Sequence, residues 1–376
     1  MLRKCLWVLA AAVAAALLCV RVLLPSLLLV RCAGAGMGKA SLRPTFLPPC
    51  RLNLTALLQQ VSPPPPLAPA ELPELWPPGD FVVLAASSSK PRYSFYLPLT
   101  ALVWRWRLGM TPLVLLVGQW HNQPRGTDWA VRECLEQLQL AGLLRLLLVP
   151  CAEAEAGAVS QSIRLSFAAL PQLHPESWAV VNDADLWPVD RDMYRLGSGD
   201  KGTVTSHNAG CCGSFDFRGT RLTELPMGSV GARVREWREL FQLPPIADPE
   251  LLARFSLQTA AAVKGSARRG WGDDQLVLSV VLQCAAAAAE GRVRFFVRET
   301  REDRIDRSRW PAAAGCFSSL LPRVFDAHLP KDGAAAWHPS LRPLFQLLIP
   351  NRSDVWQVAD RFASRFASHE PVFLHS

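Results

Sequence analysis

The chain has 376 residues, of which 50% are hydrophobic and 19% are charged, and its formal net charge is +8. This length allows one large domain or two small ones, and this hydrophobic content excludes a largely disordered chain. The basic residues are spread along the sequence, and the charged run from Arg298 to Arg309 mixes both signs. The charge pattern therefore does not indicate a nucleic-acid-binding surface, although it is compatible with a polyanionic or diphosphate substrate.

The N-terminal region has the pattern of a membrane signal anchor. Residues 1–4 include two basic side chains, and the apolar stretch that follows is interrupted by Arg21. Basic residues before an apolar stretch keep the N-terminus in the cytoplasm, so we expect a cytoplasmic tail over 1–4 and a transmembrane segment over 5–31. The alternative is a cleaved signal peptide with its processing site at residues 32–35. Both interpretations place the rest of the chain in the lumen or outside the cell.

Residues 32–79 are rich in proline and include four consecutive prolines at 63–66. Such a segment is extended and semi-rigid, which is typical of a stem that holds a domain away from a membrane. We expect the lumenal domain to cover residues 80–376. The sequons at Asn53 and Asn351 agree with this topology, because N-glycosylation takes place in the lumen.

From residue 80 the pattern alternates between strands and helices. Short apolar runs predict strands at 81–86, 113–117, 143–149 and 178–182, and the segments between them predict helices at 93–108, 128–140 and 160–170. This alternation predicts an α/β fold with a mostly parallel sheet flanked by helices. No G-x-G-x-x-G follows the first strand and no P-loop motif is present, which argues against a dinucleotide-binding site and a P-loop kinase.

The alternation stops after residue 188. The later segments predict strands at 202–206 and 293–297, a glycine-containing loop at 207–216, and helices at 230–243, 271–282 and from Ser353 onward. In the last helix, the spacing places Val355, Val358, Phe362 and Phe366 on the inner face.

The most informative stretch is the fourth predicted strand, which runs directly into Asp183 and Asp185. Open α/β sheets bind ligands at the carboxyl ends of their strands, and Mg²⁺ or Mn²⁺ is often held by one or two carboxylates together with substrate phosphates. A metal at this position would neutralise a diphosphate leaving group. The alternative is that both aspartates cap the following turn, where aspartate is common.

The Asp-x-Asp motif after a buried strand resembles that of the Golgi type II glycosyltransferases of the GT-A fold. The resemblance covers about residues 80–330 and implies a GT-A-like, Rossmann-related sheet behind a membrane anchor. It also implies that Asp183 and Asp185 bind Mn²⁺ or Mg²⁺, that Asp183 contacts the nucleotide-diphosphate sugar, and that His328 completes the metal shell or contacts the diphosphate. His338 competes for that last role, and either histidine could be structural.

The same resemblance assigns three further features. Gly210 and Gly213 match the glycine-rich loop that approaches the sugars, although an ordinary hairpin turn would look the same. Asp273 and Asp274 match an acidic pair at a helix start, where the family commonly has Glu-Asp and where a carboxylate is also favourable for the helix dipole. In inverting members the second acid is the catalytic base, which predicts Asp274 as the base and Asp273 as the group that orients the acceptor.

Three arginines are candidates for contacts to the diphosphate. Arg164, on the helix before the Asp-x-Asp strand, could reach the phosphates or form a surface salt bridge. Arg304 and Arg307 lie in the later charged run and are further candidates.

These features together predict a metal-dependent, inverting glycosyltransferase that moves a sugar from a nucleotide sugar to a glycan acceptor in the Golgi lumen. A retaining transferase is the alternative within this class. A metal-dependent phosphoesterase usually has more histidine and aspartate ligands and often binds two metals. The chain has only seven histidines and no paired histidine motif, which argues against that class. A membrane-tethered protein with a degenerate transferase fold is the non-catalytic alternative, although both acidic pairs are present.

Overall fold

The computed structural model describes residues 42–45, 47, 50, 52, 53, 56, 58, 61, 73–88, 90–120, 126–195, 203–264, 272–289, 291–298, 303–311 and 314–369. The predicted cytoplasmic tail, the predicted transmembrane segment and most of the predicted stem lie outside these residues. Within the part of the chain that is described, no helix combines the length and the apolar character needed to cross a bilayer.

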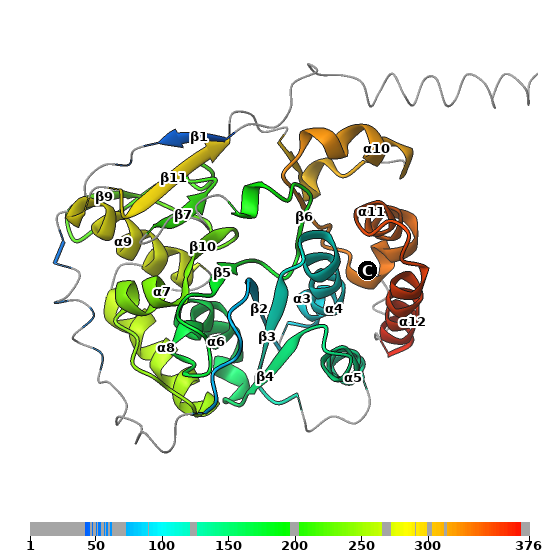
Figure 1. Ribbon diagram of the computed structural model, residues 1–376, viewed down its shortest axis with the longest axis horizontal. Coiled ribbons are helices and arrows are strands. Elements are labelled where there is room, and N and C mark those ends of the chain that lie inside the picture. The colour runs from blue at the N-terminus through cyan, green and yellow to red at the C-terminus, as the bar shows by residue number, and fades with distance from the viewer. Residues whose placement is uncertain are drawn as a thin grey trace, which may run out of the picture.

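The described residues are organised around an eight-stranded mixed sheet (Figure 1). Its strands, in spatial order, are β1 (Leu42–Thr45), β11 (Val293–Arg298), β7 (Val204–His207), β10 (Val230–Arg233), β5 (Trp178–Val181), β2 (Phe81–Ser87), β3 (Thr111–Val117) and β4 (Arg145–Val149). Strands β1 and β10 run antiparallel to the others. The predicted mostly parallel α/β sheet is therefore confirmed.

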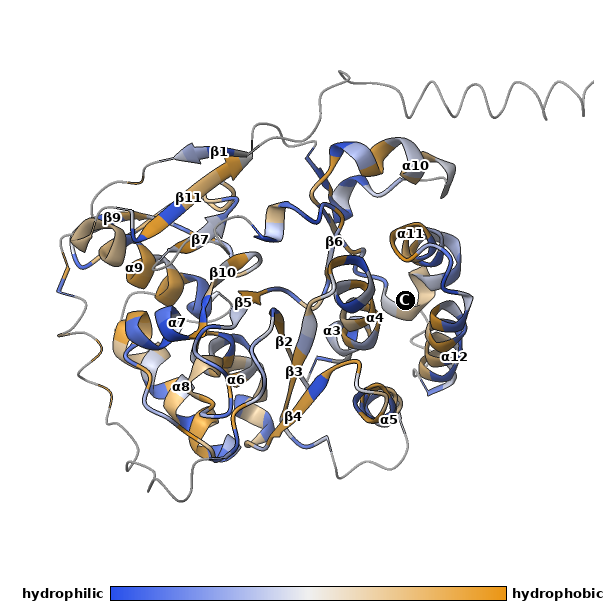
Figure 2. Ribbon diagram, viewed as in Figure 1, coloured by the Kyte–Doolittle hydropathy of each residue, from blue (hydrophilic) through white to orange (hydrophobic). Residues whose placement is uncertain are grey.

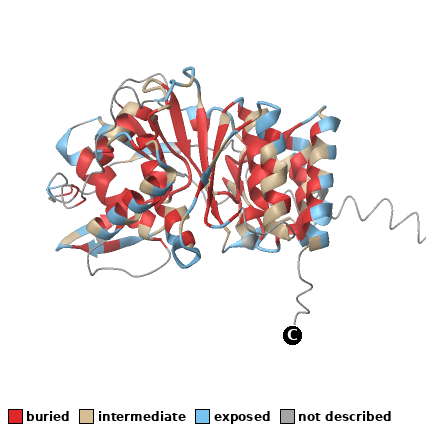
Figure 3. Ribbon diagram, turned by 90° about the horizontal axis from the view of Figure 1, so that it is seen from below, coloured by how far each residue is buried: buried red, intermediate tan, exposed pale blue. Residues whose placement is uncertain are grey.

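The central strands are buried on both faces, which explains why their sequences are continuous apolar runs. Side chains alternate along a strand, so Val83 and Leu115 pack in one hydrophobic core while Val82 and Val114 pack in the other. The strands in the middle of the molecule are accordingly hydrophobic (Figure 2) and buried, with exposed residues on the outer surfaces of the helices (Figure 3).

Helices cover both faces of the sheet (Figure 1). One face carries α6 (Glu153–Ser166), α7 (Val234–Phe241), α8 (Pro249–Lys264) and α9 (Asp273–Ala288). The other carries α3 (Pro91–Ser94), α4 (Tyr96–Val103), α5 (Thr127–Leu140), α10 (Phe317–Leu320), α11 (Arg342–Leu348) and α12 (Ser353–His369). In α12, Val355, Phe362 and Phe366 are buried as predicted, whereas Val358 is only partly buried.

Two small sheets complete the fold. Strands β8 (Ser214–Phe217) and β9 (Thr220–Thr223) form a hairpin, and β6 (Leu186–Pro188), β13 (Asp326–His328) and β12 (Arg304–Ile305) form a three-stranded sheet. Because β6 directly follows the Asp-x-Asp turn, this second sheet brings residues from beyond position 300 to the carboxyl end of β5.

The predicted helix over 230–243 is wrong in its first turn. Residues Val230–Arg233 form strand β10, which lies between β5 and β7, and the helix α7 starts at Val234. The close pairing is possible because residue 231 is glycine: a Cβ there would lie 2.6 Å from the Trp178 ring. Tertiary pairing therefore overrides a local pattern that was compatible with a helix.

Parts of the predicted stem pack against the domain. Strand β1 pairs with β11 at the edge of the main sheet, Cys50 forms a disulfide with Cys284 of α9, and Leu58 and Val61 are buried in the core. The domain boundary near residue 80 stays a prediction, but residues well before it contribute to the fold.

Candidate active site

A cavity of about 390 Å³ lies at the carboxyl ends of β2 and β5. Its volume is in the range of small-molecule sites. Residues from β2, α6, the Asp-x-Asp turn, the start of α9 and the segment around β13 contribute to its walls. The described lining residues are Ala85, Ala86, Ser87, Lys90, Tyr93, Ser160, Gln161, Arg164, Asp183, Ala184, Asp185, Met227, Gly272, Asp274, Gln275, Arg307, His328 and Lys331.

The Asp-x-Asp turn is held rigidly by buried polar groups. The Asn182 side-chain amide donates to the carbonyl oxygens of Asp183 (3.1 Å) and Leu186 (2.9 Å), which closes the turn on itself. Thr100 of α4 donates its hydroxyl to the Ala184 carbonyl at 2.5 Å. Because these groups fix the backbone, the two carboxylates are held at set positions in the cavity wall.

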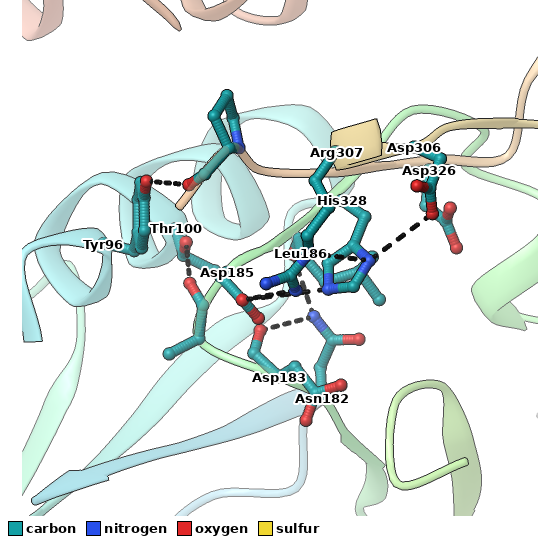
Figure 4. A network of polar contacts seen from close by, with 12 residues as sticks. Tyr96, Thr100, Asn182, Asp183, Asp185, Leu186, Asp306, Arg307, Asp326 and His328 are labelled. Atoms are coloured by element: carbon teal, nitrogen blue, oxygen red, sulfur yellow. Dashed lines mark hydrogen bonds and ion pairs between the residues drawn. The ribbon is translucent and has the colours of Figure 1, made fainter. Parts of the chain in front are cut away.

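Tyr96 of α4 supports the segment that follows β13. Its hydroxyl donates to the carbonyl oxygen of Pro330 and accepts a hydrogen bond from the Gly333 N–H at 3.2 Å. Burial raises the pKa of the Tyr96 hydroxyl above its ordinary value, so the group stays protonated as a donor. One helix therefore positions both the Asp-x-Asp turn and the segment that carries His328 (Figure 4).

Arg164 bridges two carboxylates that are far apart in the sequence. Its Nη1 lies 2.5 Å from Asp183 Oδ1 and its Nη2 lies 2.6 Å from Asp274 Oδ2. The Arg164 and Asp274 side chains are only 10% and 3% exposed, so this is a buried ion cluster and the alternative of a surface salt bridge is wrong. The remaining Asp274 oxygen, Oδ1, accepts a hydrogen bond from the Gln275 N–H at 2.8 Å.

The net pKa shifts of the two acids in the ion cluster have opposite directions. Burial raises the pKa of Asp274, and Arg164 offsets only part of this increase. Burial acts in the same direction on Asp183, but there the guanidinium of Arg164 outweighs it and lowers the pKa below its ordinary value. Arg164 therefore favours the ionised form of Asp183, whose side chain is 37% exposed.

Asp185 belongs to a separate cluster with Arg307 and His328. Figure 4 shows these side chains pointing toward one another. Arg307 Nη2 lies 2.8 Å from Asp185 Oδ2, and Arg307 Nε donates to His328 Nδ1 at 3.3 Å. His328 Nε2 is 3.7 Å from Asp185 Oδ2. Burial lowers the pKa of His328, and the neighbouring Asp185 opposes this shift only in part.

The three predicted metal ligands do not form one set in this arrangement. Asp183 is paired with Arg164, whereas Asp185 and His328 are both engaged by Arg307. Within the described residues, no three His, Cys, Asp or Glu side chains are grouped so that they could hold a metal ion. A hard cation prefers carboxylate oxygens, and one oxygen of Asp183 and one of Asp185 are already paired with a guanidinium group.

Several predicted residues lie elsewhere. Arg304 forms a buried two-point ion pair with Asp326 (2.5 and 2.9 Å) and does not line the cavity, so its predicted contact with a diphosphate is not supported. Gly210 and Gly213 flank the Cys211–Cys212 disulfide in the loop before β8 and are also not among the residues lining the cavity.

Asp273 and Asp274 are consecutive residues at the start of α9, but they do not line the same set of cavities. Asp273 lines a second cavity of about 290 Å³ between α6, α8 and α9, and does not line the first. Asp274 and Gln161 contribute to both cavities. The predicted acidic pair therefore lies at the boundary between two spaces.

Several residues at the site have no distinctive sequence signal, among them Lys90, Lys331 and Gly228. Lys90 follows the serine loop after β2, and Lys331 lies three residues after His328; lysine in such loops carries no distinctive pattern. Gly228 approaches the Asp-x-Asp turn so closely that a Cβ would lie 3.2 Å from Asp183 Oδ2. No signal in the sequence distinguishes this glycine from one in an ordinary turn.

No protein-family model matches the chain. No curated protein matches it either. Among solved structures, the chain is similar to the galactosyltransferase LgtC in complex with donor and acceptor sugar analogues, with 14% identity, 78% of this chain and 97% of that chain covered, and a TM-score of 0.39. It is also similar to the glycosyltransferase GlyE of Streptococcus pneumoniae, with 14% identity, coverage of 78% and 65%, and a TM-score of 0.39.

A third similar structure is mouse xyloside xylosyltransferase 1, with 13% identity, coverage of 66% and 97%, and a TM-score of 0.33. All three are distant likenesses. The function proposed below therefore rests on the cavity and its residues.

Proposed function

We propose that the protein is a glycosyltransferase that takes a sugar from a nucleoside-diphosphate sugar and transfers it to a glycan acceptor. One observation carries this proposal: a single cavity at the carboxyl ends of parallel strands combines exposed lysines with arginine–aspartate ion pairs. Among its described lining residues are the cations Lys90, Arg164, Arg307 and Lys331 and the carboxylates of Asp183, Asp185 and Asp274.

The cations suit a diphosphate. Arg307 presents a planar set of N–H donors that matches phosphate oxygens, and lysines bind phosphate as point charges. Lys90 and Lys331 are exposed side chains at the ends of the loops after β2 and β13. The small residues Ala85 and Ala86 of β2 leave space beside them, where a nucleoside could lie against the end of the strand.

The Arg164 cluster suits the sugar. Arg164 occupies Oδ1 of Asp183 and leaves Oδ2 of the same carboxylate at the cavity wall. A carboxylate accepts hydrogen bonds from hydroxyl groups, and a charge-assisted hydrogen bond of this kind is among the stronger ones. Because the cluster is buried and fixed, it would select hydroxyl groups by their position on the ring.

In the reaction, the acceptor oxygen forms a bond to the anomeric carbon while the bond from that carbon to the phosphate oxygen breaks. The electron pair leaves with the diphosphate, and a base takes the proton of the acceptor. Asp274 fits this role poorly, because Arg164 and the Gln275 N–H occupy its two oxygens. It fits a positioning role for Arg164, and the half-buried Asp273 faces the second cavity, where an acceptor would lie. Inversion stays a prediction, which the anomeric configuration of the product tests.

The predicted dependence on Mn²⁺ or Mg²⁺ has no assembled ligand set among the described residues, so no step of the reaction is assigned to a metal. The location is likewise part of the proposal: a Golgi membrane protein of single-pass type II topology. Its support is the basic and apolar N-terminal pattern, together with the Cys50–Cys284 and Cys211–Cys212 disulfides, which suit an oxidising compartment.

The test is hydrolysis of a panel of nucleotide sugars by the purified full-length chain, with Mn²⁺ and with a chelator. We expect slow release of one nucleoside diphosphate. Asp183→Asn should reduce this rate by about 10- to 100-fold, because it removes the charge that strengthens the hydrogen bonds to the sugar. The matched control is Asp216→Asn, since Asp216 is 71% exposed on the β8–β9 hairpin and should leave the rate unchanged.

Release of no nucleotide by a folded chain, together with no thermal shift for any nucleotide sugar, would contradict the proposal. That result would favour the non-catalytic alternative, a membrane-tethered protein with a degenerate transferase fold.

A further inference from the structure

Arg307 contacts two of the three side chains that the sequence predicted as metal ligands. Its guanidinium lines the main cavity, contacts Asp185 Oδ2 at 2.8 Å, and donates from Nε to His328 Nδ1 at 3.3 Å. Asp185 and His328 are therefore both bound to the same guanidinium group.

The backbone holds Arg307 at this position. Strand β12 pairs in parallel with β13 in the register Arg304 to Asp326 and Ile305 to Ala327, and the buried Arg304–Asp326 ion pair locks that register. Asp306 then caps the short helical turn Arg307–Arg309 by accepting a hydrogen bond from the Ser308 N–H at 2.9 Å. Arg307 is therefore directed at the cavity by paired strands and a cap.

The hydrogen bond to His328 also determines what the imidazole can do. When Nδ1 accepts a hydrogen bond, the proton of the neutral ring is on Nε2. The Nε2 atom faces Asp185 Oδ2 at 3.7 Å, and Nδ1 also lies 3.7 Å from Asp306 Oδ2, so each ring nitrogen has a carboxylate beside it. The histidine acts here as a support for Arg307.

Arg307 retains donors for a ligand. A guanidinium has five N–H groups, and the contacts to Asp185 and His328 account for two of them. The side chain is 19% exposed, so it is fixed at its base and accessible from the cavity. Lys90 and Lys331, which line the same cavity, add positive charge beside it.

We propose that Arg307, held by Asp185 and His328, does the work of a divalent metal, so that the protein binds nucleoside diphosphates without one. This inference rests on the proposed glycosyl transfer. As the bond between the anomeric carbon and the phosphate oxygen breaks, the electron pair moves to the diphosphate, and Arg307 stabilises the new charge through hydrogen bonds without giving up a proton.

The experiment measures binding and does not depend on turnover. The full-length chain is titrated with UDP, GDP, ADP and CDP by calorimetry, once with a chelator and once with Mn²⁺. Binding of Mn²⁺ alone is followed by the loss of its free-ion electron paramagnetic resonance signal. The variant is Arg307→Ala, and the matched control is Arg309→Ala, because Arg309 is exposed on the same helical turn and does not line the cavity. Circular dichroism checks the fold of each.

We expect the wild type to bind one nucleoside diphosphate with the same Kd in chelator and in Mn²⁺, and to leave the Mn²⁺ signal unchanged. Arg307→Ala should weaken that binding by about 10- to 100-fold, since charge-assisted hydrogen bonds are lost, while Arg309→Ala should bind as the wild type does. Wild-type binding that requires Mn²⁺, or wild-type affinity in Arg307→Ala, would overturn this inference and leave the glycosyltransferase proposal standing. A folded chain that binds no nucleotide in either condition would overturn both.

Discussion

Arg164 shows how much a single residue can determine at this site. It stands between Asp183, 19 residues away, and Asp274, 110 residues away, and it satisfies both. Buried charges are tolerated only when they are paired and hydrogen-bonded, so the three side chains depend on one another. Asp274 contributes chiefly by fixing the guanidinium, which in turn fixes the carboxylate that faces the cavity.

Asp128 offers a test of electrostatics away from the site. It lies in the first turn of α5, its Oδ1 is buried and has no hydrogen-bond partner, and burial together with Glu153 raises its pKa from 3.8 to about 6. Between these two values the folded chain holds a proton that the unfolded chain has lost. Stability should therefore fall as the pH rises from about 4 to about 6.

Asp128→Asn removes this unfavourable charge, so it should raise the unfolding temperature at pH 7, and this effect should disappear as the pH falls toward 3, where both states carry a mostly protonated carboxyl. The measurement is thermal unfolding followed by circular dichroism between pH 3 and pH 8. Asp216→Asn, on an exposed hairpin, should show no such pH dependence. A variant whose unfolding temperature differs from the wild type equally at all pH values would show that the effect is not electrostatic.

At the scale of elements, the helices that flank the sheet position the site from both faces. Helix α4 contributes Tyr96 and Thr100, which hold the backbone at Pro330 and Ala184, while α6 and α9 contribute Arg164 and Asp274 to the ion cluster. The disulfide between Cys50 and Cys284 ties α9 to a segment 234 residues earlier in the chain. The helix that carries the acidic pair is thus anchored at its distal half.

The Cys50–Cys284 disulfide should contribute to stability because it closes a very long loop. The double variant Cys50→Ala with Cys284→Ala is expected to lower the free energy of unfolding by about 2–4 kcal/mol. Urea denaturation of the oxidised proteins measures this loss. Cys151→Ala is the control, since that thiol is free and only partly buried. Unfolding of the double variant at the wild-type urea concentration would mean that the N-terminal segment does not stabilise α9.

At the scale of the whole molecule, the two hydrophobic cores on either side of the sheet make one continuous body out of residues from position 50 to position 366. The C-terminal forty residues, for which the sequence offered no motif, complete the second core: Phe362 and Phe366 pack on Phe95 of the α3–α4 region. The cavity lies between elements contributed by both halves of the chain.

The lumenal location predicts glycosylation at both sequons. Asn53 and Asn351 are exposed in the structure, so a lumenal chain expressed in eukaryotic cells should carry two N-glycans. Peptide N-glycosidase F should lower its apparent mass, and Asn53→Gln and Asn351→Gln should each remove one step of that shift. A chain without any glycan at either position would contradict a lumenal domain.

The sequence by itself determined the α/β class and the parallel strands from Phe81 to Val181, because the apolar runs and the helical spacing between them are local patterns. It also identified Asp183, Asp185, Asp274, Arg164, Arg307 and His328 as candidates, and the structure places all six around one cavity. Their roles depend on partners that lie far apart in the sequence.

Only the tertiary structure decided those partners. It assigned Arg164 to two aspartates, Arg307 to Asp185, and Arg304 to a structural ion pair, although nothing in the sequence separates the last two. It also made a strand of Val230–Arg233, because Gly231 allows close packing under Trp178. Local patterns report how much of a segment is buried, whereas the pairing of charges depends on which strand ends and helix starts meet in space.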